Sequence, residues 1–165
     1  MARFTIDPEV SQVWIEGSSS VHPIHATARG CTGWIEVSLA RGAIAAAPKV
    51  RGEVRIAVDR LQSGNPLVDR ETRRRIDAKR HPEIVGTASS ATRLEPDRLA
   101  VRGEIEFRGE RCEVEGELTV HPDGDRLTIE GAARFDVRDW GLEPPRVALL
   151  KVHPEITVRI HLEAT

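Results

Sequence analysis

Histidine is the residue type whose placement in this chain most directly suggests chemistry. His22 and His25 lie three residues apart around Pro23, and His81 and His153 each precede a proline. An imidazole can ligate zinc or iron, or exchange a proton near neutral pH. No Cys-x-x-Cys or His-Glu-x-x-His pattern supports a metal site. We therefore predict solvated histidines at strand ends and no metal or other cofactor; the alternative is that His22 or His25 holds a ligand head group or acts as acid or base.

A second candidate is the basic run from Arg70 to Arg80, which contains six basic and two acidic residues. Its simplest interpretation is the solvated face of a helix, and its functional interpretation is a site for a phosphate or carboxylate head group. Nucleic acid would need an aromatic platform or a larger basic surface. The net charge of −2 also argues against a generally basic nucleic-acid protein. We predict no nucleic-acid partner.

Catalytic signatures are missing from the chain. A nucleophile elbow, a Walker loop and a dinucleotide-binding fingerprint are all absent. Asp139-Trp140-Gly141 has the form of the magnesium-holding triplet of protein kinases, but the motifs that accompany that triplet do not occur. We interpret Trp140 as a packing residue, predict no catalytic residue, and consider an enzyme the less favoured class.

Most of the chain alternates apolar and polar residues, as half-buried strands do. Val54, Ile56 and Val58 show this pattern, which recurs up to Ile160 and Leu162. The pattern gives roughly eight or nine strands at a spacing of about 8–12 residues, which is typical of a sandwich or barrel. We predict an all-β fold in which one antiparallel, eight-stranded sheet closes into a barrel, as a single domain over residues 1–165.

One stretch, Asp59–Gly86, departs from this alternation. Asn65 suits a helix N-cap, and Pro66 suits the first helical turn, where its missing N–H is not needed. His81-Pro82 then favours extended backbone, because the residue before proline disfavours the α region. We predict one helix, about Pro66–Ala78, inserted between two strands and lying across one open end of the barrel.

The composition is that of a globular protein. Of 165 residues, 39% are hydrophobic, 30% charged and only 4% aromatic, so the core must be mainly aliphatic. No run of about 18 apolar residues occurs, and we predict no membrane span. The start of the chain lacks an apolar signal segment. We therefore expect a cytoplasmic protein with Cys31 and Cys112 reduced.

A series of motifs resembles the YceI family. The matching stretches are Ser19–His22, Arg29–Trp34, Val54–Asp59, Ser63-Gly64-Asn65, Asp69, Arg70, His81-Pro82-Glu83-Ile84 and Gly103–Gly109. Two positions depart from the family pattern. His81 stands where a tyrosine is usual, and Arg74–Ala78 replaces a stretch where paired phenylalanines are common. The order and spacing of the motifs hold over nearly the whole chain.

The resemblance implies a lipocalin-like barrel with a long apolar tunnel. Members of that family are associated with isoprenoid or amphiphilic lipid tails, are mostly exported and often dimerise. From alternation alone, the inward side chains either fill a core or line a cavity, and the resemblance favours the cavity. The residues expected to contact a ligand are His22, Ile24, His25, Trp34, Val54, Ile56, Val58, Val101, Ile105, Phe107, Leu118, Phe135, Val158 and Ile160.

We interpret the chain as a binding protein that holds a hydrophobic or isoprenoid-like small molecule inside the barrel, as a carrier, store or sensor. One alternative is a small-barrel enzyme or metal-dependent protein that uses His22 and His25 at the barrel mouth. Another is an interaction protein without a ligand, for instance a homodimer.

Overall fold

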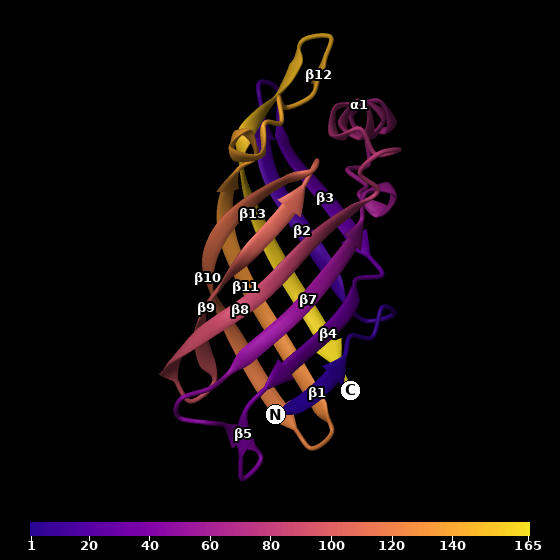
Figure 1. Cartoon of the computed structure of the whole chain (residues 1–165). Coiled ribbons are helices and arrows are strands. Elements are labelled where there is room, and N and C mark those ends of the chain that lie inside the picture. The colour runs from indigo at the N-terminus through magenta and orange to yellow at the C-terminus, as the bar shows by residue number, and fades with distance from the viewer.

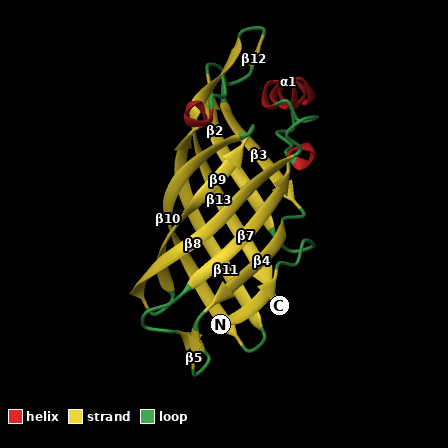
Figure 2. Cartoon of the chain, in the orientation of Figure 1, coloured by secondary structure: helices red, strands yellow, loops and turns green.

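Strands dominate the structure because apolar and polar residues alternate along most of the chain. The computed structural model describes all 165 residues, and one antiparallel sheet curls into a barrel, which confirms the expected all-β fold (Figures 1 and 2). The strands of this sheet are β1 (Ala2–Thr5), β2 (Gln12–Ser19), β3 (Pro23–Arg29), β4 (Thr32–Val37), β7 (Val50–Ala57), β8 (Glu83–Glu95), β9 (Arg98–Phe107), β10 (Glu110–Asp123), β11 (Arg126–Asp136) and β13 (Leu150–Ala164). The short strand β12 (Arg146–Val147) pairs with β13, and β5 (Leu39–Ala40) and β6 (Ala43–Ile44) form a separate hairpin.

Around the barrel the strand order is β1-β4-β7-β8-β9-β10-β11-β13-β2-β3. Backbone hydrogen bonds join each end of this path to another part of the barrel. Thr27 and Gln62 each donate an N–H to the other's carbonyl oxygen at 2.9 Å, and Ile6 pairs with Ala164. The path contains ten strands, so the expected number of eight was wrong. The difference arises because β1 and β3 also belong to the barrel. They are the two edge strands of the path, and each pairs with a full strand on one side only.

The helix α1 (Pro66–Ile76) lies at one end of the barrel, beside the hairpin of β12 (Figure 1). Asn65 Oδ1 accepts hydrogen bonds from the amides of Leu67 at 3.1 Å and Val68 at 3.3 Å, which satisfies two donors that a first helical turn leaves free. The helix ends two residues before the expected Ala78. Asp77 adopts a left-handed φ of 59° and its N–H bonds back to the last turn, as helix C-caps do.

Two short 3-10 helices, η1 (Val58–Arg60) and η2 (Val137–Trp140), lie at the same end of the barrel as α1. None of the helices has both the length and the apolar character needed to cross a membrane.

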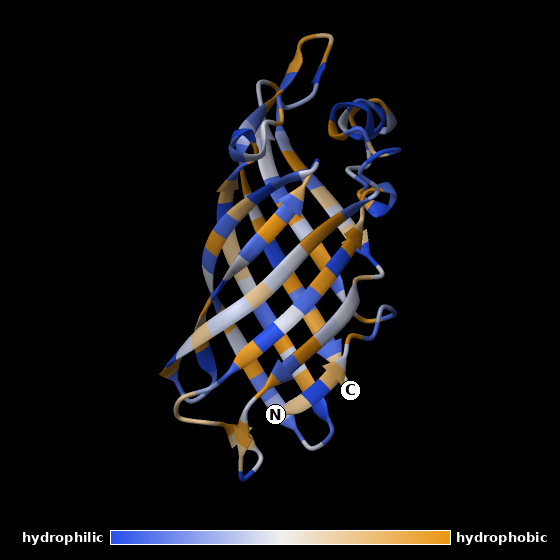
Figure 3. Cartoon of the chain, in the orientation of Figure 1, coloured by the Kyte–Doolittle hydropathy of each residue, from blue (hydrophilic) through white to orange (hydrophobic).

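The opposite end of the barrel holds both chain termini (Figure 1). This end is filled by side chains. Its buried residues are Phe4, Ile6, Val13, Cys31, Ile35, Val37, Ile44, Val50, Leu99, Val120, Leu127, Ile129, Leu162 and Ala164. Figure 3 shows the alternation of apolar and polar positions along the strands that directs these residues inward. One aromatic residue among fourteen makes this core almost wholly aliphatic, as the composition predicts.

Candidate ligand-binding cavity

A cavity of about 440 Å³ occupies the barrel between the filled end and α1. Of its 53 lining residues, 34 are hydrophobic. The volume lies within the roughly 300–1,000 Å³ of typical small-molecule sites, which are also mostly apolar with a few placed polar groups. The barrel is therefore filled at one end and hollow towards the other. Of the two alternatives that the alternation pattern left open, a filled core describes the first part and a cavity describes the second.

Small inward residues leave this space open. Gly86 lies between Val54 and Ile105 on the neighbouring strands, and a Cβ built on it would meet no atom within 4 Å. A Cβ on Gly116 would meet only the Cβ of Ala133, at 3.9 Å. Neither glycine has a positive φ, so turn geometry does not require them. Their lack of a side chain is what keeps the interior hollow.

The floor of the cavity is the upper surface of the filled end. Leu99, Val120, Ile129 and Leu162 belong to the buried core and also line the cavity. Because these side chains are almost fully buried and close-packed, they separate the cavity from the end that carries the termini.

Helix α1 forms part of the mouth. Its two buried side chains, Val68 and Ile76, both line the cavity, and Ile76 clusters with Val58 and Leu142. This apolar stripe fixes the helix against the barrel rim. Thr72 lies on the same lining face, so the helix presents both apolar and polar groups to the interior.

Trp140 supports the rim beside the helix. It is only 4% exposed, and its indole N–H donates to the Ile105 carbonyl oxygen at 2.9 Å. Its ring meets Phe135 edge-on, with ring centroids 5.8 Å apart and planes at 75°, a favoured aromatic geometry. Trp140 also lines the cavity, so the predicted packing residue is part of the cavity wall.

Some polar groups at the mouth already have hydrogen-bond partners within the chain, and others do not. Asp69 accepts hydrogen bonds from the Ser63 amide at 2.9 Å and the Ser63 hydroxyl at 2.6 Å. His153 Nδ1 lies 2.8 Å from Ser18 Oγ. Arg73 lines the cavity and forms no ion pair with any carboxylate of the chain. The guanidinium of Arg73 is therefore a cationic donor of the cavity lining that has no carboxylate partner in the chain.

Two other arginines of the helix, Arg74 and Arg75, are held by Glu71. Glu71 Oε2 accepts from Arg74 Nε at 3.0 Å, and Glu71 Oε1 accepts from Arg75 Nε at 2.9 Å. These hydrogen bonds lower the pKa of the Glu71 carboxyl to about 2. The basic run thus contains two arginines paired with Glu71, Arg80 paired with Asp77, and Arg70, Arg73 and Lys79 without a carboxylate partner.

Most of the residues expected to contact a ligand do face this cavity. Eleven of the fourteen line it: Ile24, Val54, Ile56, Val58, Val101, Ile105, Phe107, Leu118, Phe135, Val158 and Ile160. Their contact with a ligand stays a prediction.

Three expected residues lie outside the cavity. His22 and His25 are exposed, and the nearest polar partner of His22 Nδ1 is the Pro23 carbonyl oxygen at 2.7 Å. Trp34 faces outward because its neighbour Ile35 faces inward, and Arg3 stacks over its ring at 4.2 Å. These three side chains do not line the cavity, although they were expected to contact a ligand.

Several lining residues were not expected. They are chiefly the interior glycines and alanines, such as Gly86, Gly116 and Ala133, and the helix residues Thr72 and Arg73. The period-two rule could have found Gly86, because it shares the parity of Ile84 and Ala88 on one strand. The inner side of the helix could also have been found, because Val68, Thr72 and Ile76 follow one another at helical spacing.

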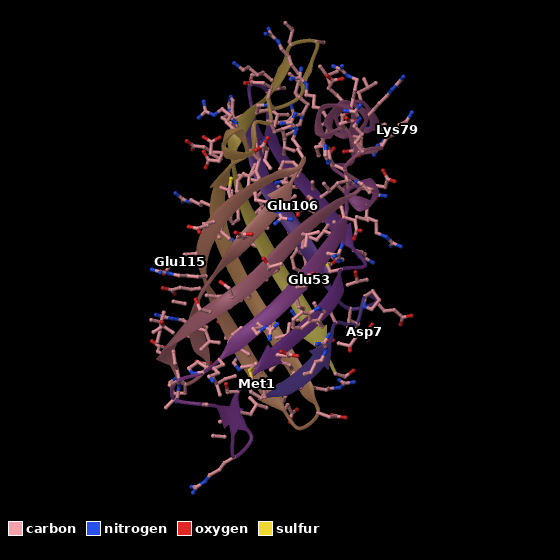
Figure 4. The ribbon with its side chains drawn as sticks, viewed as in Figure 1. Met1, Asp7, Glu53, Lys79, Glu106 and Glu115 are labelled. Carbon is pink, nitrogen blue, oxygen red and sulfur yellow. The ribbon has the colours of Figure 1, made fainter.

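The outer surface is polar and carries charged pairs between strands. Glu115 of β10 pairs with Arg102 of β9 at 3.1 Å, for example, and Glu115 projects away from the barrel in Figure 4. No group of three or more His, Cys, Asp or Glu side chains lies in a position to hold a metal ion.

A closed antiparallel barrel with an apolar cavity and a helix at its mouth is the lipocalin-like class of fold. Within that class, the chain belongs to the family of the YceI-like domain, whose family model matches residues 4–164. The family resemblance noted in the sequence is thereby confirmed over nearly the whole chain.

Solved structures show the same fold at low identity. Burkholderia cenocepacia BcnA is similar with a TM-score of 0.79 and 18% identity, covering 97% of this chain and 99% of that one. A polyisoprenoid binding domain from Saccharophagus degradans, implicated in plant cell wall breakdown, is similar with a TM-score of 0.78 and 13% identity, covering 98% and 97%. The Campylobacter jejuni YceI protein has a TM-score of 0.65 and 12% identity, covering 84% and 82%. No curated protein matches the chain by sequence.

Proposed function

We propose that this protein binds one elongated hydrophobic molecule, of isoprenoid-like character, inside its barrel. The observation that carries the proposal is the apolar cavity of about 440 Å³, open beside α1 and bounded by a packed floor. Each methylene group buried there would contribute about 0.8 kcal/mol to binding. The similarity to a solved polyisoprenoid binding domain supports the same ligand class.

The polar groups of the mouth set the orientation of such a ligand. Its apolar tail lies among residues such as Val54, Ile105 and Val158, and its polar head lies near Arg73. Arg73 has no carboxylate partner within the chain, so its guanidinium is available to a carbonyl, hydroxyl, carboxylate or phosphate oxygen.

Native mass spectrometry of protein purified from its own host tests this function, together with solvent extraction of the same sample. We expect one apolar molecule per chain, released by organic solvent. Protein that is empty after gentle purification and takes up no isoprenoid alcohol or quinone would overturn the proposal. Nothing in the geometry favours the alternative of an enzyme that uses His22 and His25, because both side chains lie outside the cavity.

A cytoplasmic location and a carrier role belong to the same proposal. Both cysteines are free, as they would remain in a reducing compartment, and burial raises the pKa of the Cys31 thiol. Fractionation of host cells, with the protein detected by antibody, tests the location. The homodimer stays a prediction, which sedimentation velocity would test.

A further inference from the structure

Exposed apolar side chains gather at the rim around the cavity mouth. Val21 in the β2–β3 turn is 62% exposed, Leu67 in the first turn of α1 is 60% exposed, and Leu149 in the β12–β13 turn is 87% exposed. Figure 1 places all three elements at the end of the barrel away from the termini. We call these three side chains the rim residues. Folding does not explain them, because they bury little surface within the chain.

Hydrogen bonds hold the three rim segments together as one surface. Ser20 Oγ donates to the Leu149 carbonyl oxygen at 2.9 Å, which joins the β2–β3 turn to the β12–β13 turn. Arg75 Nη1 donates to the Glu143 carbonyl oxygen at 3.2 Å, which joins α1 to the segment that leads into β12. The rim residues therefore project from a connected frame.

The tip of the β12–β13 hairpin is unusual for a turn. Ala148 has a φ of 52°, and such positions commonly carry Gly, Asn or Asp in a two-residue turn. The next residue, Leu149, is an aliphatic side chain at the most exposed point of the hairpin. A polar residue at this position would be compatible with the turn. The exposed leucine side chain is therefore better explained by contact with a partner outside the chain.

Charge is distributed unevenly between this rim and the rest of the molecule. The segments 18–24, 65–80 and 143–151 contain eight basic and four acidic residues, a net charge of +4. The rest of the chain contains 16 basic and 22 acidic residues, a net charge of −6. Arg70, Lys79, Arg146 and Lys151 make no ion pair, and Lys79 projects into solvent in Figure 4. The rim thus combines apolar tips with unpaired positive charge.

We propose that this rim docks on the surface of an anionic lipid bilayer. Apolar side chains that enter the headgroup region and basic side chains that attract anionic lipids are the two components of interfacial membrane binding. In this orientation the cavity mouth faces the bilayer, and an apolar tail passes between the membrane and the barrel without crossing water. The proposal concerns the rim and not the cavity, so it stands or falls independently of whether a ligand occupies the barrel.

Flotation of the full-length protein with lipid vesicles tests the docking. The probes are vesicles of phosphatidylcholine alone and vesicles of phosphatidylcholine mixed with phosphatidylglycerol. We expect binding to the mixed vesicles that weakens with added salt and falls at least about tenfold without the anionic lipid. Absence of binding to the mixed vesicles would overturn the proposal.

Two sets of variants separate the apolar and the basic contributions. The triple variant Val21→Ser, Leu67→Ser and Leu149→Ser should weaken binding about tenfold or more, because it removes the inserted apolar groups. The triple variant Arg70→Gln, Lys79→Gln and Arg146→Gln should weaken it by a similar factor and flatten the salt dependence. All six side chains are exposed, so we expect unchanged melting temperatures.

The matched control replaces exposed apolar residues away from the rim. Val10 and Leu94 are 45% and 44% exposed, and the double variant Val10→Ser and Leu94→Ser should bind vesicles as the unaltered protein does. An equal loss in this control, or full binding by the rim variants, would contradict the proposal. A different result would assign the surface to a second copy of the chain. In that case the protein would bind no vesicles and would form a dimer, and the triple variant of the rim residues would dissociate this dimer.

Discussion

Gly86 shows how single residues shape the interior. It occupies an inward position between Val54 and Ile105, where most strands place a branched aliphatic residue. A glycine in a strand weakens the strand, so its presence here suggests a purpose other than stability. The open space beside it indicates that this purpose is room for a ligand.

Filling that space should abolish ligand binding without unfolding the protein. In Gly86→Phe the new side chain enters the cavity, since a Cβ at this position meets no atom within 4 Å. We expect at least about a tenfold loss of bound apolar ligand, with a free energy of unfolding that is unchanged or raised, as in other cavity-filling variants. Native mass spectrometry and urea unfolding measure the two effects.

The matched control is Val85→Phe, which adds the same ring to the preceding residue, on the outer face of β8 and outside the cavity lining. This variant should keep its ligand. If Gly86→Phe and Val85→Phe retained equal amounts of ligand, the cavity would not be the binding site.

At the scale of the element, α1 is a short helix whose ends are set by local chemistry. Asn65 caps its first turn and Asp77 closes its last. Isolated helices of this length are marginal in water, so α1 depends on these caps and on the burial of Val68 and Ile76. Changes to a cap should therefore loosen the mouth before they affect the barrel.

Removal of the N-cap gives a direct test. Asn65→Ala deletes the oxygen that accepts from the Leu67 and Val68 amides, and we expect a loss of about 0.5–2 kcal/mol in helix stability. Hydrogen exchange at these two amides should accelerate, while exchange in the filled end of the barrel stays slow. Asn65→Asp keeps the acceptor and should behave as the unaltered protein; equal exchange in both variants would contradict the capping role.

The pairing of Glu71 with Arg74 and Arg75 predicts an acid dependence. The folded pKa of about 2 lies below the ordinary value of 4.5, so the stabilisation is complete above about pH 4.5 and is lost as the pH falls towards 2. Glu71→Gln should lower stability slightly at neutral pH and reduce the fall of stability across this window.

Urea unfolding measured at several pH values across that window tests the prediction. Glu113→Gln removes an exposed glutamate that makes no ion pair and serves as the matched control. The same acid dependence in Glu71→Gln and in the unaltered protein would contradict a stabilising role for the pair.

At the scale of the whole molecule, the barrel divides into a close-packed end and a hollow end. Leu127 is fully buried in the packed end and does not line the cavity, whereas Leu118 faces the cavity. A close-packed environment loses both transfer energy and contacts when a side chain is truncated. A wall that already borders empty space has fewer contacts to lose.

Truncation should therefore cost more at the packed end. We expect Leu127→Ala to lower the free energy of unfolding by about 2–5 kcal/mol, and Leu118→Ala to lower it by clearly less. Chemical denaturation of the two variants in ligand-free protein measures the difference. Equal losses would mean that the cavity collapses or is filled in solution.

Much of the fold followed from local rules. Alternation predicted the strands and most of the inward residues, because successive side chains of a strand point to opposite faces. Asn65, Pro66 and the left-handed Asp77 are local signals as well, although the last of these was not foreseen and the helix ends before Ala78. The number of strands was wrong because pairing at the two ends of the strand path depends on segments far apart in the chain, such as Ile6 and Ala164.

The site itself was predictable only in part. Ile35 and its inward parity could have shown that Trp34 faces outward. The same rule could have shown that His25 faces outward, because it alternates with Ile24 and Ala26 on β3. The direction of His22 could not be read in this way, because it lies in a turn.

By itself, the sequence determined an all-β chain with one capped helix, an aliphatic interior and the YceI-like resemblance. These properties follow from residue types and short spacings. The tertiary structure alone decided that Gly86 and Gly116 both border a hollow, that Arg73 lines this cavity, and that Val21, Leu67 and Leu149 share one rim. The physical reason is that empty space and shared surfaces arise between strands and turns distant in the chain, and no local pattern encodes what lies opposite a side chain.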